Sequence, residues 1–109
     1  MATTYKVLGQ SNPSATTATT LYTVPSATNT VVSSISVANL AGSAATFRIA
    51  IRPAGAVLAN QHYLAYDVTV AATDTTIVTA GITLGATDVI TVYASTANLA
   101  FSAWGSEIA

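Results

Sequence analysis

Apolar and polar residues alternate along most of this chain. Phe47, Ile49 and Ile51 occupy every second position of one segment, and Arg48 and Arg52 occupy positions of the other parity. Neighbouring side chains of a β-strand point to opposite faces of its sheet, so this segment predicts a half-buried strand whose charged residues lie in water. No stretch shows the 3.6-residue period of an amphipathic helix over a useful length.

Segments of this kind recur about every ten residues and are separated by turn-forming residues. Threonine and valine are frequent in them, and their branched Cβ atoms favour strands. The pattern predicts an all-β fold: an antiparallel β-sandwich of about seven to nine short strands, with immunoglobulin-like or jelly-roll topology. It does not choose between these two topologies. The predicted strands span residues 5–9, 20–24, 31–38, 46–52, 63–70, 75–79, 82–84, 88–94 and 98–104.

The same alternation predicts the core. Within residues 63–70 it directs the apolar positions from Leu64 to Val70 inward and Asp67 outward. Within residues 31–38 both parities carry apolar or small residues, which predicts burial on both faces. Phe101 is expected inside as well. The predicted core further consists of Phe47, Ile49, Ile51, Leu64, Tyr66, Val68, Ile90, Val92 and Tyr93.

The composition narrows the classes of function. The 109 residues form one domain, 1–109, in which residues 1–10 are an apolar, strand-like arm able to add to the sheet edge of a neighbour. The chain carries 3 basic and 4 acidic residues, and this balance argues against a nucleic-acid partner, which requires clustered Lys and Arg. An apolar content of 51% argues against disorder, and the absence of cysteine excludes disulfides.

The hydropathy does not predict a membrane partner. The longest run of apolar residues and glycine is 54–59, far shorter than the roughly 20 residues that a spanning helix needs. Residues 1–6 lack the apolar centre of a signal peptide. We therefore expect a protein that is made and folded in the cytoplasm of the cell that produces it.

Residues that carry chemistry are scarce. His62 is the single histidine, and we expect its imidazole to be solvated or engaged in a simple hydrogen bond. The four acidic residues are isolated rather than spaced as calcium ligands. Asp74 and Asp88 each follow a turn and precede a strand, where a carboxylate can accept hydrogen bonds from local N–H groups. We therefore predict a protein that is not an enzyme and has no metal site and no cofactor.

Four side chains are candidates for contact with a partner: Arg48, Arg52, Trp104 and Tyr5. Arg48 and Arg52 share the outer face of one predicted strand, about 13 Å apart. They either keep that face soluble and block edge-to-edge aggregation or dock an acidic partner. Trp104 either covers the bottom of the core or lies in a contact with another chain. Tyr5 belongs to the N-terminal arm.

Several segments of the chain resemble small virion structural proteins of tailed phages, cyanophages among them. The resemblance is carried by residues 20–25, which end in LYTVP, and by residues 31–39 and 44–51, which overlap the two ends of VANLAGSAATFRI. Residues 5–10 and 101–107 also contribute to it. It implies a capsid cement (decoration) protein, or else a tail, baseplate or fibre component, located in the virion. It supplies no catalytic residues. The implied partners are the major capsid protein or another virion protein.

The composition is compatible with such a role. Low charge and many small side chains allow flat surfaces to approach closely and repeatedly, and they favour self-association into a homo-oligomer. A trimer would match the local three-fold points of a capsid lattice. The competing hypothesis is a glycan-binding module on a fibre tip, which would use Trp104 or Tyr63 as an aromatic platform.

Overall fold

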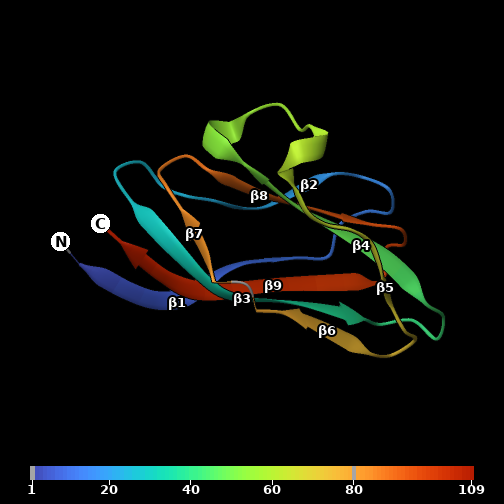
Figure 1. Ribbon diagram of the computed structural model, residues 1–109. Helices are drawn as coiled ribbons and strands as arrows, with labels where there is room; N and C mark the ends of the chain where they lie inside the picture. The colour runs from blue at the N-terminus through green and yellow to red at the C-terminus, as the bar shows by residue number, and fades with distance from the viewer. Residues whose placement is uncertain (1, 80) are drawn as a thin grey trace.

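The structure, a computed structural model, describes residues 2–79 and 81–109. Over these residues the chain forms nine strands, arranged in two antiparallel sheets packed face to face, and two short 3₁₀ helices (Figure 1). The strands coincide with the predicted segments, so the all-β sandwich is confirmed. They are β1 (Thr3–Ser11), β2 (Thr19–Thr23), β3 (Asn29–Asn39), β4 (Ala45–Arg52), β5 (Tyr63–Val70), β6 (Thr75–Val78), β7 (Ile82–Leu84), β8 (Val89–Ala94) and β9 (Leu99–Ile108); the helices are η1 (Pro53–Gly55) and η2 (Asn60–His62).

The strand order selects the jelly roll. The first sheet has the order β1-β9-β3-β6, with β7 also beside β3, and the second sheet has the order β2-β8-β4-β5. Strands β6 and β7 pair with successive parts of β3 and act as one interrupted strand. In an immunoglobulin sandwich several consecutive strands pair with each other. Among the described strands here, β4 and β5 are the only consecutive partners. Apart from the connection from β6 to β7, which stays beside β3, the other connections cross between the sheets as a jelly roll requires.

The core lies between the two sheets. Phe47 of β4 and Phe101 of β9 meet there edge to face, with ring centroids 6.2 Å apart and an interplanar angle of 76°. Phe47, Phe101 and the predicted core residues Ile49, Ile90 and Val92 are fully buried. These predictions are confirmed. The strands that carry these residues, β4, β8 and β9, have a partner on both sides and keep their alternation of inward and outward side chains.

The prediction of which β5 side chains point inward is wrong for most of the strand. Between the pairs Phe47–Val68 and Ile49–Ala65, three residue steps of β5 oppose two of β4, which is a β-bulge. Asp67 lies in this bulge with a φ of 52°. The extra residue reverses the alternation, so Ala65 packs against the core. Leu64 and Tyr66 are therefore exposed instead of buried. Val68 pairs with Phe47 and keeps its predicted parity, but it is exposed as well because β5 is an edge strand. The predicted core residues Ile51 and Tyr93 are half-buried.

The loop from β4 to β5 covers part of the outer face of the second sheet. It contains η1 and η2 and lies over β4 and β8 at the top of Figure 1. Ala50 and Val89 face outward in the sheet and are nevertheless buried, because this loop packs on them. Strand β3, predicted to be buried on both faces, buries Val32, Ile35 and Val37 on its inner face only. Its outer face carries no comparable cover among the described residues.

Candidate partner-binding face

The outer face of the first sheet is formed by small, hydroxylated and aromatic side chains. Val7 lies opposite Trp104, and Tyr5 lies opposite Ser106 on the same face. The Tyr5 side chain is 83% exposed and the Trp104 side chain 36%. The outward-facing residues of this surface, which we call the uncharged face, are Tyr5, Val7, Gln10, Val31, Ser34, Ser36, Ala38, Ile77, Ala100, Ser102, Trp104 and Ser106. None of these side chains carries a formal charge.

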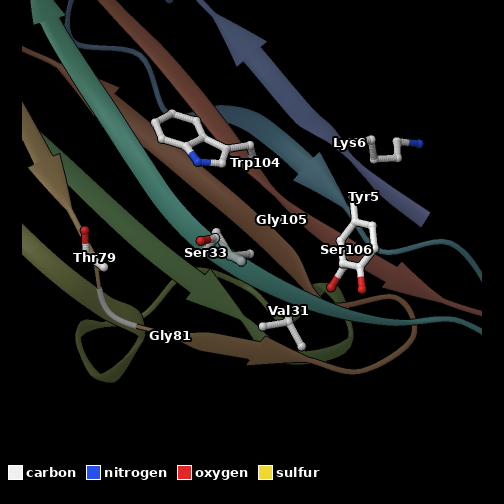
Figure 2. Close-up of a pocket in the computed structure, with 10 residues that line it drawn as sticks. Tyr5, Lys6, Val31, Ser33, Thr79, Gly81, Trp104, Gly105 and Ser106 are labelled. Carbon is white, nitrogen blue, oxygen red and sulfur yellow. The ribbon is translucent and has the colours of Figure 1, made fainter. Parts of the chain in front are cut away.

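A groove of about 650 Å³ crosses this face between β1, β9 and β3 and reaches Thr79 and Gly81, which lie between β6 and β7. Figure 2 shows Trp104 at one side and Tyr5 at the other, with Ser33 between them. Lys6 is the charged residue among the described residues that line the groove, and its Nζ lies 3.2 Å from Oε1 of Glu107. The groove therefore offers apolar and hydroxyl contacts rather than a free charge.

Two β-bulges flank Trp104 and shape the groove. On β1 the register shifts between Val7 and Gly9, and on β3 it shifts between Val32 and Ser34, so both neighbouring strands have an extra residue at the level of the indole. Bulges bend a strand and increase its twist locally. Gly105 makes the close approach possible, since a Cβ atom there would overlap the carbonyl oxygen of Val31.

A buried polar network fixes the end of the sheet beside the groove. The Tyr22 hydroxyl lies 2.5 Å from Oε2 of Glu107 and 2.8 Å from the hydroxyl oxygen of Thr30, and so links the two sheets. Burial of the phenol and its hydrogen bond to Glu107 raise the pKa of Tyr22 to about 12. The hydrogen bond from Tyr22, helped by Lys6, lowers the pKa of Glu107. Glu107 is therefore a structural carboxylate.

The two predicted arginines lie on the other sheet. Both lie on the outer face of β4, as predicted, but each is engaged within its own chain. Arg48 Nε donates a hydrogen bond of 2.6 Å to Asp67, and its guanidinium lies between the rings of Tyr66 and Tyr93, 4.1 and 4.3 Å from their centroids. This hydrogen bond is the main cause that raises the pKa of Arg48 above its ordinary value. Tyr66 and Tyr93, predicted as core, hold this guanidinium instead.

Arg52 is held as well: its Nε donates a hydrogen bond to the Thr91 hydroxyl, and one terminal nitrogen donates to the Ala56 carbonyl. The structure therefore brings Tyr5 and Trp104 together on the uncharged face and places Arg48 and Arg52 on the opposite sheet. Trp104 lies outside the core.

Residues 3–10 of the N-terminal arm predicted at 1–10 lie in β1, which pairs with β9 of the same chain; Met1 lies outside the described residues. Ala2 and Ala109 exchange two backbone hydrogen bonds, and the two chain ends lie side by side in Figure 1. As an edge strand, β1 has one side without a partner in the sheet order. That side keeps the capacity to pair with a strand of another chain.

The residues weighed for chemistry have structural contacts. His62 Nδ1 accepts a hydrogen bond from the Ala59 N–H, Asp74 Oδ1 accepts one from Thr75, and Asp88 accepts hydrogen bonds from Gly85 and Ala54. The contacts with Thr75 and Gly85 are the local roles predicted for the two aspartates, whereas the contact with Ala54 joins Asp88 to the β4–β5 loop and was not predicted. In residues 2–79 and 81–109, no cluster of three or more His, Cys, Asp or Glu side chains could hold a metal ion. No helix in this part of the chain is long and apolar enough to span a membrane.

Sequence reasoning missed Val31 and Ser33 as components of the groove. One signal was available, since the chain has no charged residue from Val7 to Phe47 and this interval contains β3. The bulges that bring these side chains around Trp104 leave no such signal, because they add one residue without a characteristic residue type.

No protein-family model, curated protein or solved structure matches this chain.

Proposed function

We propose that this protein is a phage capsid cement protein, which bridges and stabilises the lattice of the major capsid protein. The observation that carries the proposal is the uncharged face: a broad sheet surface with Tyr5, Val7 and Trp104 exposed and with no formal charge on its outward side chains. A surface of this kind on a small domain is typical of a contact with another protein. Jelly rolls occur in viral capsids, but also in lectins, so the fold supports the proposal without carrying it.

The rest of the molecule suits a structural role. The buried core between two sheets and the internally paired ionic groups give a rigid module. A cement protein can act through individually weak contacts, because the lattice repeats them and multivalency multiplies their effect. Self-association into a homo-oligomer is part of the proposal, and a trimer would occupy local three-fold positions.

A second candidate is a tail, baseplate or fibre component of the virion. It is favoured by an open notch between Asn60, Tyr63 and Tyr66 on the second sheet, which is the kind of feature a receptor-contacting part would use. The same uncharged face would then attach the domain to another tail protein.

Copy number separates the two candidates. Quantitative mass spectrometry of purified virions, scaled to the major capsid protein, should give hundreds of copies for a cement protein. Tens of copies or fewer, or antibody labelling confined to the tail in electron micrographs, would overturn the cement proposal and favour the second candidate. Absence of the protein from purified virions would overturn both.

A further inference from the structure

The notch on the second sheet is built by the end of the β4–β5 loop and the start of β5. η2 contributes Asn60, and β5 contributes Tyr63 and Tyr66, which together line about 340 Å³ of open space. The N–H of Ala59 donates to His62 Nδ1 and the N–H of Tyr63 donates to the Asn60 carbonyl, which fixes the chain just before the first tyrosine. The bulge at Asp67 turns Tyr66 outward. A second register shift, between Ala65 and Tyr63, places Tyr63 opposite Ala50 on the same side of the sheet.

The two rings are held in place before any ligand arrives. They meet edge to face, with centroids 4.9 Å apart and an interplanar angle of 86°. The Arg48 guanidinium lies over the Tyr66 ring, and Asp67 holds that guanidinium through two hydrogen bonds. An aromatic site whose side chains are already ordered loses less conformational entropy on binding.

The chemistry of the notch selects a class of ligand. The faces of the tyrosine rings are electron-rich and attract weakly positive C–H groups. The Asn60 carboxamide offers two donors and one acceptor, and each phenol offers one donor and an acceptor. The lining residues carry no formal charge, and the nearest ionic groups, Arg48 and Asp67, neutralise each other. The volume of the notch falls within the range of small-molecule sites.

We propose that the notch between Asn60, Tyr63 and Tyr66 binds a neutral saccharide. A sugar ring presents C–H groups on one face and hydroxyl groups at its rim, which match the tyrosine rings and the Asn60 amide respectively. The site lies on the opposite sheet from the uncharged face, so saccharide binding and attachment to a particle can occur on the same molecule. The inference is independent of the cement proposal and extends the second candidate, which draws on the same notch.

The test uses the full chain on an array of neutral and acidic glycans, followed by calorimetric titration with the neutral oligosaccharide that gives the strongest signal. We expect saturable binding of neutral glycans. Asn60→Ala and Tyr63→Ala should each weaken it about tenfold, as expected for the loss of one good polar or stacking contact. Tyr66→Phe keeps the ring and should weaken binding less than Tyr63→Ala.

Trp104→Ala is the matched control, since it removes an exposed aromatic ring from the other sheet and should leave the titration unchanged. Thermal melting of each variant verifies that it is folded. Binding of no neutral glycan, or equal affinities for the wild type, Asn60→Ala and Tyr63→Ala, would overturn the proposal. Loss of binding in Trp104→Ala alone would also overturn it and transfer the site to the groove. None of these results bears on the copy number in the virion, so a failure of the saccharide proposal can be distinguished from a failure of the cement proposal.

Discussion

Arg48 donates two hydrogen bonds to the carboxylate of Asp67, a residue whose backbone has a φ of 52°. The left-handed conformation belongs to the bulge in β5 and places the Asp67 carboxylate beside the outer face of β4. The same bulge turns Tyr66 onto the Arg48 guanidinium. One irregular residue thus determines both the ion pair and the aromatic surface of the second sheet.

The backbone at position 67 predicts a contrast between two substitutions. Asp67→Asn should change stability little, because asparagine tolerates positive φ and the ion pair that it removes is exposed. Asp67→Val should lower the free energy of unfolding by about 1–3 kcal/mol more, because a β-branched residue is strained in this conformation. Urea unfolding of both variants measures the difference. Equal stabilities would show that the bulge relaxes without strain.

The bulge also shows how far the sequence alone could lead. Alternation predicted all nine strands, because period-two patterning follows directly from strand geometry. It failed at Leu64 and Tyr66, because the residue inserted at the Asp67 bulge reverses the parity of β5 as far as a second register shift between Ala65 and Tyr63. No residue type marks that insertion, because aspartate is also common in ordinary turns and loops.

The candidate sites were predicted in part for the same reason. Tyr5 and Trp104 were named individually, but their meeting depends on the pairing of β1 with β9, which join opposite ends of the chain. Arg48 and Arg52 were placed correctly on one outer face because they lie on one strand. The partners of Arg48 come from β5 and β8, and such long-range pairings are beyond a periodicity argument.

The Phe47 ring is the most direct test of the core. Phe47→Ala removes a fully buried ring that contacts Phe101 across the two sheets, and it should lower the free energy of unfolding by about 3–5 kcal/mol. Guanidinium unfolding measures the loss. Leu40→Ala is the control, because Leu40 is largely exposed and its truncation should have an effect within about 0.5 kcal/mol. A loss below 1 kcal/mol for Phe47→Ala would contradict the packing described here.

The link between the sheets through Tyr22 predicts a pH-dependent stability. Tyr22→Phe removes the hydroxyl shared by Thr30 and Glu107 and should destabilise the fold by about 1–2 kcal/mol at neutral pH. The pKa of Tyr22 is raised from 10.0 to about 12 in the fold, so its contribution is fully present below pH 10 and is lost as the pH rises through 12. The stability difference between wild type and Tyr22→Phe should therefore shrink between pH 10 and pH 12.

At acid pH the stability depends on Glu107, and its contribution changes with pH in the opposite direction to that of Tyr22. The pKa of Glu107 is lowered from its ordinary value of 4.5, so its contribution is present above that pH and is lost as the pH falls through the folded value. Glu107→Gln should remove this component of acid sensitivity. Denaturant titrations at a series of pH values measure both the Tyr22 and the Glu107 contributions to the free energy of unfolding. A difference between wild type and Tyr22→Phe that stays constant up to pH 12 would contradict the network.

Gly105 should resist substitution because of its position beside β3. A Cβ atom there would overlap the Val31 carbonyl oxygen, and backbone cannot move aside as the end of a flexible side chain can. Gly105→Ala should therefore break the pairing of β9 with β3 and lower the thermal midpoint strongly. Gly42→Ala is the matched control, since no atom lies within 4 Å of its added Cβ and the change should be neutral or slightly stabilising. Similar melting curves for the two variants would exclude the close approach.

A single charge placed on the uncharged face should weaken the binding of a partner to it. Val7→Glu adds a carboxylate beside Trp104 at a position that is already 55% exposed, so the fold should tolerate it. A partner packed against this face would have to desolvate that charge without a counterion, which should weaken attachment to purified capsids at least about tenfold. Val57→Glu makes the same substitution in the loop on the other sheet, where Val57 is 88% exposed, and should attach normally. Cosedimentation of each variant with capsids that lack the protein measures attachment. Equal attachment of Val7→Glu and wild type would remove the uncharged face from the contact, whereas loss in Val57→Glu alone would assign the contact to the opposite sheet.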